Sequence, residues 1–104
     1  MEKILNKISD IIERYESGEW QSVENLRIML RELSSNYYFL TKYNIESFNI
    51  HNAIQYKNKG SVASGLIRAN ELCPELRMTR KILFATSKVI DAMRSEIGIL
   101  KNEQ

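Results

Sequence analysis

The side chains that most often carry out catalysis are few in this sequence and stand far apart. His51 is the only histidine, and a histidine acting as a general base needs a nucleophile and an orienting carboxylate close by. Glu46 lies five residues before His51, so the two side chains point to different faces if this segment is a helix. We therefore predict that His51 belongs to a polar layer that fixes helix register, and we predict no catalytic residue.

Cysteine and the carboxylates do not favour a metal centre or an enzyme either. Cys73 is the only cysteine, which excludes an internal disulfide and a thiolate cluster and fits a reducing cytosol. It precedes Pro74 at a predicted helix start, where no histidine accompanies it, so a packing role is expected. The acidic pairs within residues 10–13 and 19–24 have no histidine at ligand spacing, and the glycines form no phosphate-binding loop. We predict no metal, no cofactor and no small-molecule substrate.

Basic side chains, by contrast, gather in the second half of the chain. Residues 57–94 hold eight basic groups and three acidic ones. Arg77, Lys81 and Lys88 fall within about 40° of one another on a helix, and Arg80 is close to them. An uneven charge of this kind serves either a polyanionic partner or only the solvation of a helical face.

An aromatic ring accompanies part of this basic set. Tyr56 stands directly before Lys57, and Lys59 follows two residues later. Cations neutralise the phosphates of a single strand, and an unpaired base stacks on an aromatic ring, whereas the alternative interpretation is a solvated face beside a buried tyrosine. The candidate nucleic-acid-binding residues are Tyr56, Lys57, Lys59, Arg68, Arg77, Arg80, Lys81 and Lys88.

Helices must position these side chains. A first helix is predicted from about Glu2 to Glu16, because apolar residues recur there at three- and four-residue steps and Ser17-Gly18 ends the pattern. A second helix is predicted from near Glu19 to about residue 59. Its apolar heptad seam turns polar further along, and a break near the first polar position is an alternative. The apolar part is Val23, Leu26, Leu30, Leu33, Tyr37 and Leu40, and the polar part is Asn44, Ser47 and His51.

The length of the second helix predicts an interface with other subunits. Forty helical residues span about 60 Å, whereas a compact chain of this size has a radius of gyration of about 13 Å. The helix must either bend back or project and be covered by another subunit. We favour the second, because residues 34–56 hold only two charged groups and are rich in tyrosine. The predicted interface residues are Tyr37, Tyr38, Leu40, Tyr43, Ile45 and Phe48.

Two further helices complete an all-α domain over residues 1–104. Ser61 is a suitable N-cap for a short helix over about Val62 to Leu72. A long C-terminal helix from about Pro74 to Leu100 has the most regular apolar seam, formed by Leu76, Thr79, Leu83, Thr86, Ile90, Met93, Ile97 and Leu100. No stretch approaches the roughly 20 apolar residues of a membrane span. We expect two long and two shorter helices in a hairpin or small bundle that assembles with other subunits in the cytoplasm.

From Tyr56 onward the chain resembles the small phage recombination mediators of the UvsY type. The resemblance covers Tyr56-Lys57-Asn58-Lys59-Gly60, then Leu66-Ile67-Arg68-Ala69-Asn70, and finally the spaced apolar residues between Lys81 and Lys101. It implies a ring-forming oligomer that binds single-stranded DNA and helps a recombinase to load, with Lys57, Lys59 and Arg68 among the binding residues.

Two hypotheses of different classes follow. The first is a homo-oligomeric phage or prophage accessory protein that binds single-stranded nucleic acid non-specifically, as a recombination mediator does. The second is a small helical inhibitor or adaptor that binds another protein through the surface between Tyr37 and Phe48. The response of binding to salt separates them, because only the first predicts a steep loss of oligonucleotide affinity as salt rises.

Overall fold

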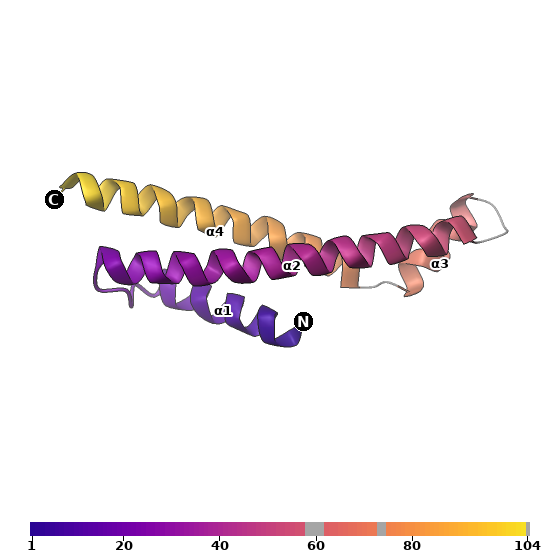
Figure 1. The fold of residues 1–104 in the computed structure, drawn as a ribbon, viewed down its shortest axis with the longest axis horizontal. Helices are drawn as coiled ribbons and strands as arrows, with labels where there is room; N and C mark the ends of the chain where they lie inside the picture. The colour runs from indigo at the N-terminus through magenta and orange to yellow at the C-terminus, as the bar shows by residue number, and fades with distance from the viewer. Residues whose placement is uncertain (58–61, 73–74, 104) are drawn as a thin grey trace.

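Four helices make up the computed structural model, which describes residues 1–57, 62–72 and 75–103 and contains no strand within those ranges. They are α1 (Glu2–Glu16), α2 (Val23–Lys57), α3 (Val62–Leu72) and α4 (Glu75–Glu103). The long helices α2 and α4 pack against each other, and α1 lies beside the first half of α2 (Figure 1). The predicted all-α fold with two long and two shorter helices is confirmed. No described helix is long and apolar enough to cross a membrane.

The turn between α1 and α2 explains where each helix stops. Ser17 is the C-cap of α1, and Gly18 takes a positive φ of 74°, the conformation that glycine adopts without a steric penalty. The Trp20 side chain donates a hydrogen bond from Nε1 to the Tyr15 carbonyl at 3.2 Å. The Ser22 hydroxyl accepts a hydrogen bond from the Asn25 amide at 3.1 Å, as an N-cap does. The predicted start near Glu19 was therefore wrong by about one helical turn.

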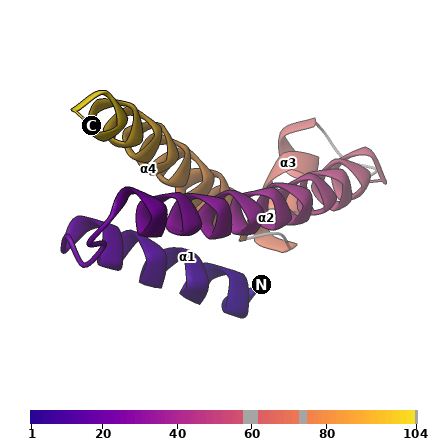
Figure 2. The same cartoon turned by 60° about the vertical axis from the view of Figure 1, so that its left-hand side comes forward.

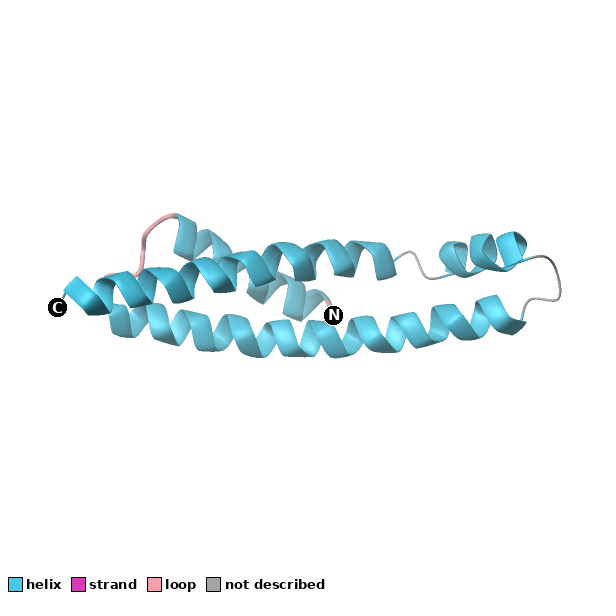
Figure 3. Ribbon diagram, turned by 90° about the horizontal axis from the view of Figure 1, so that it is seen from above, coloured by secondary structure: helices cyan, strands magenta, loops and turns pink. Residues whose placement is uncertain are grey.

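Helix α2 runs unbroken through the point at which its seam becomes polar. The molecule is 63 Å long, 24 Å wide and 18 Å deep, with a radius of gyration of 18.0 Å. Figure 3 shows α3 and α4 following one another along α2, so the chain forms an elongated antiparallel hairpin whose second arm is made of two helices. Of the two predicted alternatives, bending back of α2 is wrong. Helix α2 projects beyond α1, and α3 and α4 of the same chain pack along it, whereas its coverage by another subunit stays a prediction.

The apolar core lies where α1, α2 and α4 overlap. Leu26 and Leu33 of α2 and Met93 of α4 are fully buried there, and the whole set of buried core residues is Ile8, Ile11, Leu26, Met29, Leu33, Leu40, Ile90 and Met93. Leu40 is 0% exposed and Tyr37 packs against this core, which corrects the prediction that Leu40 faces another subunit. The heptad positions of Tyr37 and Leu40 therefore pack against helices of the same chain.

Polar pairs continue the contact between the two arms beyond this core. The Asn44 amide of α2 donates hydrogen bonds to the Thr79 hydroxyl at 2.7 Å and to the Leu76 carbonyl at 3.3 Å. One α2 heptad later, His51 Nε2 lies 2.7 Å from the Asn70 side-chain oxygen of α3. The predicted polar layer at His51 is thus present, and it matches the polar positions of α2 with polar residues of the opposite arm.

Candidate nucleic-acid interface

A line of basic side chains with an aromatic ring among them runs along the outer face of α4. Arg77, Lys81, Phe84 and Lys88 follow one another at steps of four, three and four residues, which places them on one side of the helix. We call these four residues the α4 stripe. All four are exposed, and they lie opposite the seam that α4 packs against α2. Figures 1 and 2 show that no other helix covers this side of α4.

The ring of Phe84 is the unexpected member of the α4 stripe. Phe84 is 65% exposed, and the Lys88 ammonium lies 4.5 Å from the centre of its ring. A cation over the face of a ring is attracted by the ring's negative face. The analysis of charge alone missed Phe84, although placing all residue types on the same helical projection shows it between Lys81 and Lys88. The stripe therefore combines positive charge with a surface on which a base can stack.

The cations of this region have no acidic partners. Within the described ranges, neither Arg77, Arg80, Lys81 nor Lys88 forms an ion pair. The acidic Glu75 at the start of α4 is engaged by the Tyr43 hydroxyl of α2, and this hydrogen bond raises the pKa of Tyr43. Among the described residues, no ion pair therefore neutralises the positive charge of the α4 stripe.

A groove opens beside the first turns of α4, where α2, α3 and α4 meet. Its volume is about 640 Å³, and Arg77 belongs both to this groove and to the α4 stripe. The remaining lining is polar or aromatic with two leucines, and the complete lining is Phe48, His51, Asn52, Gln55, Leu66, Asn70, Leu76, Arg77 and Arg80. We call this site the α2–α3–α4 groove. The shared arginine makes the groove and the stripe one continuous surface.

Within the groove, the Arg80 side chain of α4 contacts the Phe48 ring of α2. The Arg80 guanidinium carbon lies 5.2 Å from the centre of the Phe48 ring, and Phe48 remains 40% exposed. Phe48 was predicted as an interface residue, and the structure places it in the groove instead of on the outer face of α2. Two aromatic rings, Phe48 and Phe84, thus accompany the basic residues of α4, each with a cation over it.

Other predicted binding residues lie at the far end of the hairpin. Tyr56, which is 88% exposed, and Lys57 occupy the last turn of α2, one turn past Asn52 of the groove. Arg68 is exposed on α3, but it is two residues from both Leu66 and Asn70, so helical periodicity turns it away from the groove. Lys59, Ser61, Cys73 and Pro74 lie outside the described residues. The structure brings Arg77, Arg80, Lys81 and Lys88 together and does not bring Arg68 to them.

The remaining predicted interface residues divide between two environments. Tyr43 is partly buried by its contact with Glu75 at the start of α4. Tyr38 and Ile45 are 64% and 55% exposed, and their spacing of seven residues places both on the side of α2 opposite the core. Of the predicted interface residues, only Tyr38 and Ile45 expose apolar surface that neither packs within the described part of the chain nor lines the groove.

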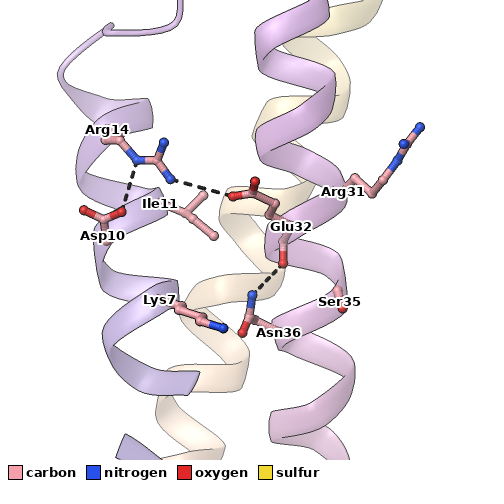
Figure 4. A pocket seen from close by; sticks show the side chains of 8 residues that line it. All are labelled: Lys7, Asp10, Ile11, Arg14, Arg31, Glu32, Ser35 and Asn36. Carbon is pink, nitrogen blue, oxygen red and sulfur yellow. Dashed lines mark hydrogen bonds and ion pairs between the residues drawn. The ribbon is translucent and has the colours of Figure 1, made fainter. Parts of the chain in front are cut away.

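A second cleft, between α1 and α2, contains an ion-pair network centred on Arg14, and Lys7 and Arg31 also line it (Figure 4). Arg14 lies between two carboxylates, 3.2 Å from that of Asp10 and 3.8 Å from that of Glu32. These ion pairs help to hold α1 against α2. The described side chains include no group of three or more histidines, cysteines or carboxylates that could hold a metal ion.

Comparison of the chain with protein-family models, with curated proteins and with solved structures finds no match. Function is therefore inferred from the geometry of the α4 stripe and of the adjoining groove.

Proposed function

We propose that this protein binds single-stranded nucleic acid without base-sequence preference, along the α4 stripe and the adjoining groove. The observation that carries the proposal is the line of cations without acidic partners, Arg77, Lys81 and Lys88, with the exposed ring of Phe84 among them. Backbone phosphates are bound by such cations, and unpaired bases stack on such rings whatever their sequence.

The mixture of charge and aromatic surface favours a single strand over a duplex. In a duplex the base faces are stacked on one another, so an exposed phenylalanine on the protein has no base face to contact. A single strand offers both phosphates and base faces to a surface about one helix wide. Phe84 and Phe48 would each contact a base while the neighbouring lysines and arginines contact phosphates.

The proposal includes self-association and a role as a recombination mediator. Several copies in one assembly would repeat the α4 stripe, so that weak contacts to one strand would add through avidity. A recombinase as the protein partner is supported only by the resemblance of residues 56–101 to mediators of the UvsY type. The exposed Tyr38 and Ile45 support self-association through the outer face of α2.

The test is the salt dependence of binding to a labelled oligonucleotide, measured by fluorescence anisotropy. We expect affinity to fall steeply as salt rises, with a logarithmic slope of about −0.7 for each phosphate neutralised. The double variant Arg77→Glu/Lys81→Glu should weaken binding and make that slope shallower by about 1.4, because two phosphate contacts are lost.

The charge-matched control is Lys3→Glu/Arg27→Glu, which changes two exposed basic residues of α1 and α2 by the same total charge. It should bind nearly as the parent protein does, which separates contact at the stripe from general attraction to a positive molecule. A flat response to salt, or no binding at low salt, would contradict the proposal. A change of oligomer mass in the Arg77→Glu/Lys81→Glu variant would instead assign these residues to a subunit interface.

A second candidate function is the binding of another protein through the outer face of α2. Tyr38 and Ile45 favour it, because large apolar side chains exposed one heptad apart are typical of helix–helix interfaces. Such binding would respond little to salt and would be lost in Tyr38→Ala/Ile45→Ala. The two proposals therefore predict opposite responses of the same protein to salt and to two pairs of substitutions.

A further inference from the structure

The α2–α3–α4 groove combines three kinds of side chain that a nucleotide requires. Phe48 offers a ring, Asn52 and Gln55 offer amides, and Arg77 and Arg80 offer positive charge. Its volume of about 640 Å³ lies within the range of about 300–1,000 Å³ typical of small-molecule pockets. We propose that this groove is a subsite for one unstacked base of a single strand, together with its phosphate.

The Phe48 ring is partly exposed where it lines the groove. The Arg80 guanidinium carbon lies over the ring, 5.2 Å from its centre, and Phe48 remains 40% exposed. A base stacked on the exposed part of the ring would add an aromatic contact to this cation–ring contact. Stacking is tolerant of sequence because every base has an aromatic face.

The amides of the groove are free to bind the edge of a base. Within the described part of the chain, the side chains of Asn52 and Gln55 make no hydrogen bond, although both are partly buried. Each amide has donors and an acceptor, so it can rotate to suit any of the four bases. Asn70 differs from them, because its oxygen is already held by His51 at 2.7 Å and fixes the position of α3.

The positive charge of the groove favours a nucleic-acid strand over an apolar helix as its ligand. Arg77 and Arg80 have no ion-pair partner in the described ranges, so an apolar occupant would bury two uncompensated charges. A phosphate neutralises them and accepts bidentate hydrogen bonds from a guanidinium. An acidic peptide would also neutralise them but would leave the Phe48 ring without a stacking partner.

The inference rests on the proposed function, and its experiment separates the failure of each. Affinity is measured for a labelled oligothymidine of about twelve nucleotides and for an abasic strand of the same length, which keeps the phosphates and lacks the bases. The parent protein should bind the oligothymidine about tenfold more tightly or better, which is the effect of stacking one base. Phe48→Ala should reduce this preference about tenfold, by the contribution of one base, and keep the affinity for the abasic strand, whereas Phe48→Tyr should retain the full preference.

Phe39→Ala is the matched control, because it removes an exposed ring of α2 that lies outside both the groove and the α4 stripe, and it should leave the preference unchanged. If the preference disappears in Phe84→Ala and persists in Phe48→Ala, the base is bound on the stripe and the groove assignment is overturned. Equal binding of both strands by the parent protein overturns the subsite and the base contact at Phe84, and leaves standing the binding of strand phosphates along the α4 stripe. Competition by polyglutamate as effective as that by the abasic strand, with equal binding of both strands, would assign the groove to an acidic peptide. Absence of binding to either strand overturns the proposed function itself.

Discussion

Arg14 and Arg77 have the same side chain in opposite surroundings. Arg14 is partly buried between the carboxylates of Asp10 and Glu32, and its charge is used to join α1 to α2. Arg77 is exposed, lines the groove, and faces no carboxylate in the described part of the chain. A count of charges cannot separate the two, because the difference lies in which acidic residues the fold brings near each arginine.

Two threonines of the α4 seam should respond in opposite ways to the same substitution. Both are fully buried, but the Thr79 hydroxyl accepts a hydrogen bond from Asn44, whereas the Thr86 hydroxyl has no partner among the described residues. Thr79→Val should lower the free energy of unfolding by about 1–3 kcal/mol, because it leaves the Asn44 amide without that acceptor. Thr86→Val keeps the side-chain shape and removes a buried, unpaired hydroxyl, so stability should be unchanged or higher.

Urea denaturation followed by circular dichroism at 222 nm measures both changes, and each variant serves as the control for the other. Thr86 lines an apolar groove between α1 and α4 whose other residues include Leu5, Ile12 and Ile82, so valine suits its surroundings. Equal destabilisation by the two substitutions would show that the Asn44–Thr79 hydrogen bond contributes nothing particular to stability.

For individual residues, the sequence predicts the basic side chains of the site but not the aromatic rings that they contact. Arg77, Arg80, Lys81 and Lys88 were identified from helical spacing, which needs no tertiary information. The partnership of Arg80 with Phe48 joins residues 32 positions apart, and it depends on where α4 crosses α2. Leu40 was assigned wrongly to a subunit interface for a similar reason. An apolar heptad position has the same sequence pattern whether it faces another subunit or the second arm of its own chain.

The helices themselves are largely predictable from local signals. Periodicity and Ser17-Gly18 gave the bounds of α1, and the short helix Val62–Leu72 has the predicted limits. The start of α2 was misplaced because residues 19–22 contain no proline or glycine that would exclude helix. Only the hydrogen bond that the Ser22 hydroxyl accepts from the Asn25 amide identifies Ser22 as the cap. Periodicity does not show which helices contact each other. In the structure, α3 and α4 both pack against α2, one after the other along its length.

A hydrogen bond between α1 and α4 should make stability depend on alkaline pH. The Tyr15 hydroxyl donates to the Glu96 carboxylate at 2.6 Å, and burial together with this carboxylate raises the pKa of Tyr15 from 10.0 to about 12. The folded state therefore holds the tyrosine proton more tightly than the unfolded state does. Its stabilising effect is complete below pH 10 and is lost as pH rises from about 10 to 12.

The variant Tyr15→Phe isolates this effect from other alkaline titrations. At pH 7 it should lower the free energy of unfolding by about 1–2 kcal/mol through loss of a hydrogen bond to a charged group. Between pH 10 and 12 the difference between Tyr15→Phe and the parent protein should shrink, because the parent loses the same interaction. Trp20, stacked 6.3 Å from the Tyr15 ring, reports unfolding by fluorescence. A constant difference across this pH range would contradict the role assigned to the proton.

The whole molecule has a core at one end only. The buried apolar cluster draws on α1, α2 and α4, whereas the other end consists of the second half of α2 with α3 and the start of α4. At that end the arms are held by polar pairs such as His51 with Asn70, and Ala69 of α3 packs with 0% exposure against α2. A two-layered end without a large apolar core is the part of the molecule that would gain most stability from a further layer.

Self-association is the property of the whole molecule that these features predict. Large apolar side chains remain exposed along the second half of α2 and on α3, among them Ile45, Ile50, Val62 and Ile67. Burying such residues against a second copy gains roughly 25 cal/mol for each Å² of apolar surface removed from water. We therefore expect a mass greater than that of the 12.2 kDa chain in multi-angle light scattering at tens of micromolar.

Tyr38→Glu/Ile45→Glu should shift that mass towards the monomer, because each change places a charge on the outer face of α2. The matched variant Arg31→Glu/Lys42→Glu alters the same face at exposed positions that are already charged, and it should change the mass less. If avidity contributes to strand binding, the first variant should also bind a long oligonucleotide more weakly while binding a short one as before. A monomeric parent protein at tens of micromolar would refute the interface, and strand binding would then depend on the α4 stripe of a single chain.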